Sequence, residues 1–123
     1  MFRLFIVLGS LNMFLSVALG AFGAHGLKGK ISADMLAVYE TGVHYHMIHA
    51  IALLIIAFIG EKFIGTSLPA WSGWLMQIGI ILFSGSLYAL SISGIRILGA
   101  ITPIGGVAFL AGWVLLVIAA IKG

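Results

Sequence analysis

The chain has 123 residues, of which 63% are hydrophobic and 7% charged, and its mean hydropathy is +1.28. Soluble domains carry roughly 25% charged residues, so a water-soluble domain of this composition would lack the polar side chains to cover its surface. The formal net charge of +3 comes from scattered residues that form no continuous basic stripe for a phosphate backbone. The lack of cysteine excludes disulfides and thiolate chemistry. The composition therefore predicts an integral membrane protein that does not bind nucleic acid.

The first apolar run covers residues 4–24 and follows Arg3. It could be confused with a signal peptide, but it is long for a signal core and carries Asn12 in its middle, so we expect a transmembrane helix. Small or polar residues recur along it at three- and four-residue steps and therefore share one helix face. In lipid, such a face lets two helices approach closely. The face is predicted to be a packing seam and consists of Gly9, Asn12, Ser16, Gly20 and Gly23.

The second helix is predicted to begin after Ser32, a favoured N-cap residue, with Asp34 in its first turn. No strong helix breaker follows before residue 59, so the helix would be roughly 40 Å long at 1.5 Å per residue. The apolar core of a bilayer is only about 30 Å thick. The first two turns, which include Glu40, should therefore lie at or beyond the membrane interface. The membrane span itself is expected at residues 43–60.

The third span is expected at residues 70–93, where Trp71 and Trp74 have the character of interfacial anchors. Four polar residues in it follow one another at seven-, four- and three-residue steps. A polar stripe of this kind should face other helices or a wet cavity rather than lipid. The stripe consists of Gln77, Ser84, Tyr88 and Ser91.

The fourth span is expected at residues 103–121, because Thr102 and Pro103 form a favoured helix start. The fold class is therefore all-α, an integral membrane bundle of four transmembrane helices in a single domain, 1–123. Four spans place both termini on one side of the membrane. The positive-inside rule gives no orientation, because each side receives three basic residues: Arg3, Lys62 and Lys122 against Lys28, Lys30 and Arg96.

Histidines near the glycine-rich corner at residues 20–30 are the main candidates for chemistry. On a helical wheel His46 and His49 lie about 60° apart, so we expect them to point into the same neighbouring surface. His44 lies roughly 150° away, where it can pair with Glu40 four residues earlier. At the corner, His25, Glu40, His49 and Arg96 are expected to be neighbours. The candidate functional polar cluster is His25, Glu40, His46, His49, Arg96, Gln77, Ser84 and Tyr88.

Three interpretations of these histidines stay open. Two histidines at i and i+3, with His25 as a further ligand, could hold a metal or a haem. A histidine that changes charge near neutral pH could handle protons or ions. The residues favour the third interpretation, a hydrogen-bonded interfacial cluster that holds no ligand. The sequence contains no nucleophile with its base and no phosphate-binding loop, so it predicts no enzyme. A stable metal site usually needs a third or fourth ligand, and we expect no metal and no cofactor.

With these residues on the page, the chain resembles the YgdD/YwdK-type family of small bacterial membrane proteins, a domain of unknown function. The resemblance rests on GAFGAHGL at residues 20–27, LFSGSLY at 82–88, TPIGG…FLAGW at 102–113, and the pattern Thr41-Gly42…Tyr45…His49-Ala50. It implies a four-helix, multi-pass protein of the bacterial cytoplasmic membrane and supplies no activity. The family commonly has glutamine where this chain has His46, which weakens a metal site there and leaves His25 and His49 as the family-pattern histidines.

Two functions compete at this level. An oligomer could form a small-solute or ion pathway, as a transporter or channel, because the polar stripe and the histidines could line it. Alternatively, the small-residue seams suit a non-transporting accessory module that binds lipid or a partner. Expected partners are the lipid bilayer, further copies of the chain and another membrane protein.

Overall fold

The computed structural model describes residues 2–63 and 65–122, and these are almost entirely helical. Four helical segments are long and apolar enough to cross a membrane: Phe2–Leu27, Ala33–Lys62, Leu68–Ser93 and Arg96–Lys122. The predicted all-α membrane bundle of four spanning helices is thus confirmed. The elements are α1 (Phe2–Phe22), the π-helical turn η1 (Gly23–Leu27), α2 (Ala33–Lys62), α3 (Leu68–Gly79), the π-helical turn η2 (Ile80–Ser84), α4 (Gly85–Ser93), the 3₁₀ turn η3 (Arg96–Ala100) and α5 (Thr102–Lys122).

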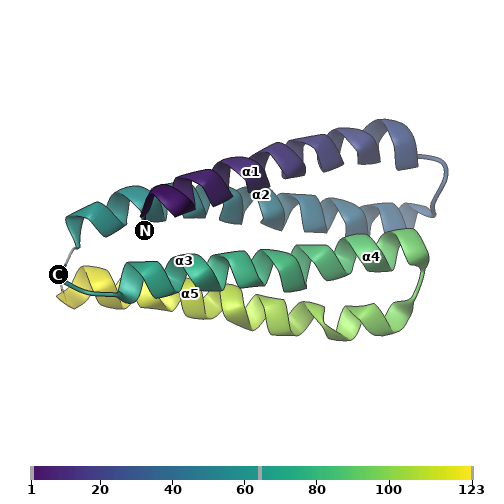
Figure 1. Cartoon of the computed structure of the whole chain (residues 1–123). Helices are drawn as coiled ribbons and strands as arrows, with labels where there is room; N and C mark the ends of the chain where they lie inside the picture. The colour runs from purple at the N-terminus through teal and green to yellow at the C-terminus, as the bar shows by residue number, and fades with distance from the viewer. Residues whose placement is uncertain (1, 64, 123) are drawn as a thin grey trace.

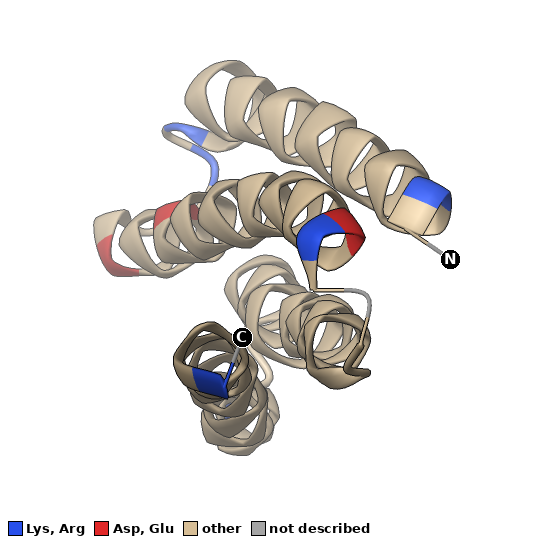
Figure 2. Ribbon diagram, turned by 90° about the vertical axis from the view of Figure 1, so that its left-hand side faces the viewer, with Lys and Arg blue, Asp and Glu red and all other residues tan. Residues whose placement is uncertain are grey.

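The helices form two antiparallel hairpins that lie side by side. α1 and α2 make one hairpin, and the continuous segment α3–η2–α4 makes the other with α5 (Figure 1). Both chain ends lie at the same end of the bundle, together with the link between α2 and α3 (Figure 1). Charged residues lie toward the helix ends and in the connecting loop, while the middles of the helices carry none (Figure 2). This distribution suits a bundle whose middle lies in hydrocarbon.

α2 is the most enclosed helix. It packs against α1 on one side and against α3, η2 and α4 on the other, while α5 packs against α3 and η2. Half of the most apolar stretch of α2 is buried, against 22% in each of the spans that contain α1 and α5. α1 and α5 are therefore the outer helices, and their exposed faces carry large apolar side chains such as Phe14 and Leu110. These faces suit contact with lipid.

The helices approach most closely where small residues lie between them. Gly9, Asn12 and Ser16 are buried, and a Cβ added to Gly9 would contact the side chain of Leu54 on α2. The predicted seam on α1 therefore packs against α2. The two predicted N-caps differ in the structure. The Ser32 hydroxyl accepts the predicted capping bond from the Met35 N–H at 3.1 Å. The Thr102 hydroxyl instead hydrogen-bonds to Ser86 at 2.6 Å.

Replacing Gly105 with alanine should destabilise the bundle, whereas the same change at Gly106 should not. A Cβ at Gly105 would lie 2.8 Å from the Cα of Phe83, so α5 would have to move away from η2, but a Cβ at Gly106 would lie 3.9 Å from the Phe83 ring. Both variants gain the same helix propensity, which makes them a matched pair. We expect Gly105→Ala to cost about 1–3 kcal/mol, seen as a lower unfolding midpoint by circular dichroism in detergent. Equal midpoints for the two variants would contradict this packing.

Candidate functional site

A chain of hydrogen bonds through the middle of the bundle joins α1, α2 and the third span. The Asn12 amide on α1 donates to Gln77 Oε1 on α3 at 2.7 Å. The Asn12 Oδ1 atom lies 3.0 Å from His46 Nε2 on α2, and His46 Nδ1 lies 2.9 Å from the Tyr88 hydroxyl on α4. Asn12 and His46 are buried. Four polar side chains that could not face lipid therefore contact one another.

The donors and acceptors in this hydrogen-bond chain determine which ring nitrogen of His46 carries a proton. Asn12 uses its amide hydrogens for Gln77 and for the Leu8 carbonyl at 2.8 Å, so its oxygen is the acceptor that faces His46. His46 Nε2 must therefore carry a proton, and in the neutral imidazole Nδ1 accepts from the Tyr88 hydroxyl. A neutral imidazole satisfies every atom of the chain. We infer that these hydrogen bonds hold the three spans in register and do not present a reactive group.

His49 belongs to a second, separate set of contacts. The Trp113 indole N–H on α5 donates to His49 Nε2 at 3.1 Å, and His49 Nδ1 lies 2.7 Å from the Tyr45 carbonyl oxygen. Because an indole nitrogen only donates, Nε2 is the acceptor and Nδ1 carries the proton. The His49 ring stacks on Phe109, with ring centroids 3.5 Å apart and planes 9° apart. His49 is thus the opposite neutral tautomer from His46 and is fixed on three sides.

These contacts form the wall of a groove between α2 and α5. The groove has a volume of 590 Å³. Tyr45 and Phe83 extend the wall, with ring centroids 4.6 Å apart. The groove runs along the line where α2 and α5 meet, and the two helices contact each other there through His49, Phe109 and Trp113. Its lining residues are Tyr45, Ile48, His49, Phe83, Pro103, Gly106, Val107, Phe109, Leu110 and Trp113.

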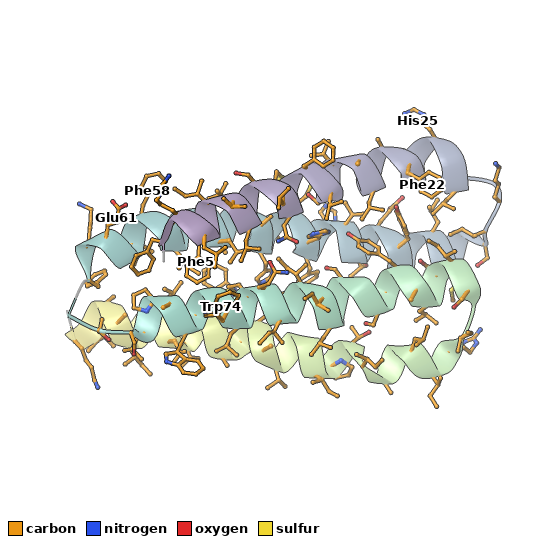
Figure 3. All side chains as sticks on the ribbon, viewed as in Figure 1. Phe5, Phe22, His25, Phe58, Glu61 and Trp74 are labelled. Carbon is orange, nitrogen blue, oxygen red and sulfur yellow. The ribbon has the colours of Figure 1, made fainter. Side chains whose placement is uncertain are left out.

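The prediction that His49 lies at the corner beside His25, Glu40 and Arg96 is wrong. His49 lies about 24 Å along α2 from Ala33, whereas His25 lies in η1 at the end of α1 and points away from the bundle (Figure 3). His25, Glu40 and Arg96 are all exposed. The physical reason is the helical rise, because sixteen residues of α2 separate the corner from His49. The glycine-rich corner and the buried histidines are therefore at different depths in the bundle.

The expectation that His46 and His49 point into one surface is also wrong. A separation of about 60° on α2 is enough to direct His46 between α1 and α4, and His49 toward α5. Both ring nitrogens of each histidine already have partners. Within residues 2–63 and 65–122, no group of three His, Cys, Asp or Glu side chains is placed to hold a metal ion.

The polar stripe of the third span does face other helices, as predicted. Gln77 contacts α1 through Asn12, the Ser84 hydroxyl donates to the Gly42 carbonyl on α2 at 2.8 Å, and Tyr88 contacts α2 through His46. The π-helical turn η2 follows Gln77, ends at Ser84 and precedes Tyr88. A π turn inserts extra backbone into a helix. One continuous span thereby contacts both α1 and α2.

Sequence reasoning missed Trp113 as a contact of His49. The available signal is its position in the middle of the fourth span, far from both interfaces where tryptophan is usually found. A buried indole N–H normally has a hydrogen-bond partner. A mid-span tryptophan therefore indicates an acceptor on a neighbouring helix, and a histidine supplies one.

The comparisons with known proteins agree on one family. The family model described as DUF423, a protein of unknown function, matches residues 19–106. The UPF0382 membrane protein YwdK of Bacillus subtilis strain 168 is 56% identical over 120 residues, which cover 98% of each chain. The UPF0382 membrane proteins SAB0533 of Staphylococcus aureus and SH2409 of Staphylococcus haemolyticus are 54% and 51% identical over 121 residues, covering 98% of this chain and 97% of theirs. No solved structure matches.

His46→Gln should be tolerated and His46→Leu should not. A glutamine amide can donate to Asn12 Oδ1 and accept from the Tyr88 hydroxyl, as the neutral imidazole does, whereas leucine leaves both groups unpaired. We expect His46→Leu to lower the free energy of unfolding by about 1–3 kcal/mol and His46→Gln by clearly less. SDS-titrated unfolding in mixed micelles would measure both, with His44→Leu at an exposed position of α2 as the control. Equal losses for glutamine and leucine would refute the donor–acceptor assignment.

Proposed function

We propose that this chain, which belongs to the DUF423 family of proteins of unknown function, is a non-enzymatic, non-transporting module of the bacterial cell membrane that holds a lipid acyl chain in the groove between α2 and α5. The observation that carries the proposal is the groove itself, a hollow of 590 Å³ within the spanning part of the bundle. Sites for small molecules have volumes of about 300–1,000 Å³ and mostly apolar linings.

The closed interior supports this function over transport within one subunit. A pathway for ions or polar solutes needs polar groups that can exchange partners with the solute. Here Gln77, Ser84 and Tyr88, the residues expected to line such a pathway, contact other helices. Throughout the described residues, no buried side-chain nitrogen or oxygen lacks a hydrogen-bond partner. The interior polar groups thus act between helices.

The shape and chemistry of the groove favour an acyl chain as its occupant. Its wall is built from aromatic rings that cannot relax easily, because Trp113 and Phe109 hold His49 in place. Its rim is aliphatic, from residues such as Ile48 and Leu110. In a bilayer, lipid chains surround this rim at the highest concentration of any apolar ligand. A flexible chain can fill a groove of this volume while the contacts of His49 with α5 stay in place.

The hydrogen bonds of His46 and His49 also support the proposal that the protein is not an enzyme. The indole N–H of Trp113 requires a neutral His49, and both ring nitrogens of His46 and of His49 are engaged by neighbouring side chains and backbone. Neither is free to act as a general base while the bundle is intact. This supports a binding module rather than a catalyst.

Filling the groove should remove the bound lipid. Gly106→Leu places a side chain in the groove where an added Cβ would meet only the Phe83 ring, at 3.9 Å. Gly85→Leu is the matched control, because a Cβ there would have nothing within 4 Å and Gly85 does not line the groove. With a lipid that carries a photoreactive acyl chain, we expect groove labelling, mapped by peptide mass spectrometry, to fall severalfold for Gly106→Leu only.

Two results would contradict the proposal. One is groove labelling that is the same in Gly106→Leu, Gly85→Leu and the unchanged protein, since the label would then report general contact with the bilayer. The other is ion or solute flux into proteoliposomes above the background of empty liposomes. That flux would instead support the oligomeric pathway.

A further inference from the structure

A second hollow lies on a different flank of α2, between α2 and α1. It has a volume of 310 Å³. Its apolar part is formed by small and aliphatic residues that include Gly20, Ala24 and Val43, and its polar part by Glu40 and His44 on α2. Both polar side chains are exposed. The α2–α5 groove shares none of these residues, so the two hollows are independent sites.

The depth of this hollow follows from the helix geometry. Glu40 lies 22 residues before Lys62, the last residue of α2, which corresponds to about 33 Å along the axis. The apolar core of a bilayer is about 30 Å thick. If Lys62 lies at one interface, Glu40 lies at the other, where hydrocarbon meets the headgroups. His44 lies one turn, about 6 Å, deeper along the helix.

Side-chain direction strengthens this placement. Side chains on an α-helix lean toward its N-terminus, and α2 begins at this interface. The Glu40 carboxylate therefore extends outward to the level of the headgroups, and the His44 imidazole extends to the level of the lipid ester groups. From the interface inward, the lining residues of α2 include Glu40, Val43, His44 and Met47, and Gly20 of α1 lies against Val43. The hollow is therefore anionic at its outer end, has a hydrogen-bonding group about one turn deeper, and is apolar at Met47.

We propose that this α1–α2 hollow binds a phospholipid with a primary-amine headgroup, such as phosphatidylethanolamine. The ammonium group would pair with the Glu40 carboxylate, an ester oxygen would accept a hydrogen bond from His44, and the upper part of one acyl chain would pack on Met47. A carboxylate at the edge of hydrocarbon is costly unless a cation compensates it, and an ammonium headgroup supplies that cation from the bilayer. A phosphatidylglycerol headgroup carries no cation for Glu40.

The test compares two lipids on the intact protein. The protein in mild detergent is mixed with equal amounts of phosphatidylethanolamine and phosphatidylglycerol that carry the same acyl chains, and native mass spectrometry counts each bound lipid. We expect the unchanged protein to retain more phosphatidylethanolamine. Glu40→Gln should lower its retention about threefold to fivefold, the size expected for one partly exposed ion pair, and leave phosphatidylglycerol unchanged.

The control is Glu61→Gln. Glu61 is also exposed on α2, but it lies at the opposite end of the bundle (Figure 3), so its removal should not change the preference between the lipids. An equal effect of Glu40→Gln and Glu61→Gln would overturn the site, since the preference would then follow total charge. The variant Ala24→Leu, which fills the hollow from η1, provides a second test. Loss of lipid in Ala24→Leu without any headgroup effect of Glu40→Gln would also overturn the proposal.

These outcomes are separate from those of the α2–α5 groove. Gly106→Leu should leave the preference for the amine headgroup intact, because Gly106 does not line the α1–α2 hollow. A headgroup preference that disappears in Gly106→Leu would place the lipid in the other groove and overturn the assignment to Glu40.

Discussion

The arrangement of the bundle depends on one constraint: polar groups within hydrocarbon must find their partners inside the protein. The helices satisfy the backbone, and the interior polar side chains bond to one another or to backbone carbonyls. His46 has a central part in this, because its two nitrogens join an amide on α1 to a hydroxyl on α4. Ser72 makes a similar connection on the other side, donating to the Gly112 carbonyl of α5 at 2.7 Å. Directional bonds therefore fix the rotation of each helix, which lipid-like apolar packing alone specifies less well.

Glycine and π-helical turns make these bonds geometrically possible. Without a Cβ, Gly105 brings the backbone of α5 against the backbone of η2, which places Phe83 and Phe109 close together, with ring centroids 5.5 Å apart. The same turn lets the third span direct Gln77 toward α1 and Ser84 toward α2. Close approach and change of direction are thus two results of one local departure from α-helical geometry. The aromatic wall of the groove follows from both.

The sequence predicts the parts of this structure that depend on local rules. Helix existence, the seam on α1 and the inward direction of the polar stripe follow from hydropathy and spacing. The pairing of Asn12 with His46 does not, because it depends on how two spans are offset along the membrane normal. The error at the corner has the same origin: a helical wheel gives direction around an axis but not depth along it. A π turn such as η2 also has no reliable sequence signal, so the partner of each stripe residue was beyond prediction.

The same constraint favours ligand sites on the outside of the bundle. Because every buried side-chain nitrogen and oxygen in the described residues already has a hydrogen-bond partner, a ligand that entered the interior would have to break bonds it could not all replace. A ligand that binds at the flanks of α2 does not have to break these hydrogen bonds. There, the hollows between the hairpins and beside α1 present rigid aromatic or interfacial polar groups to molecules that already lie alongside in the bilayer. A small bundle with a closed interior and open flanks is thus built to contact lipid at its sides, and its polar interior keeps those sides in shape.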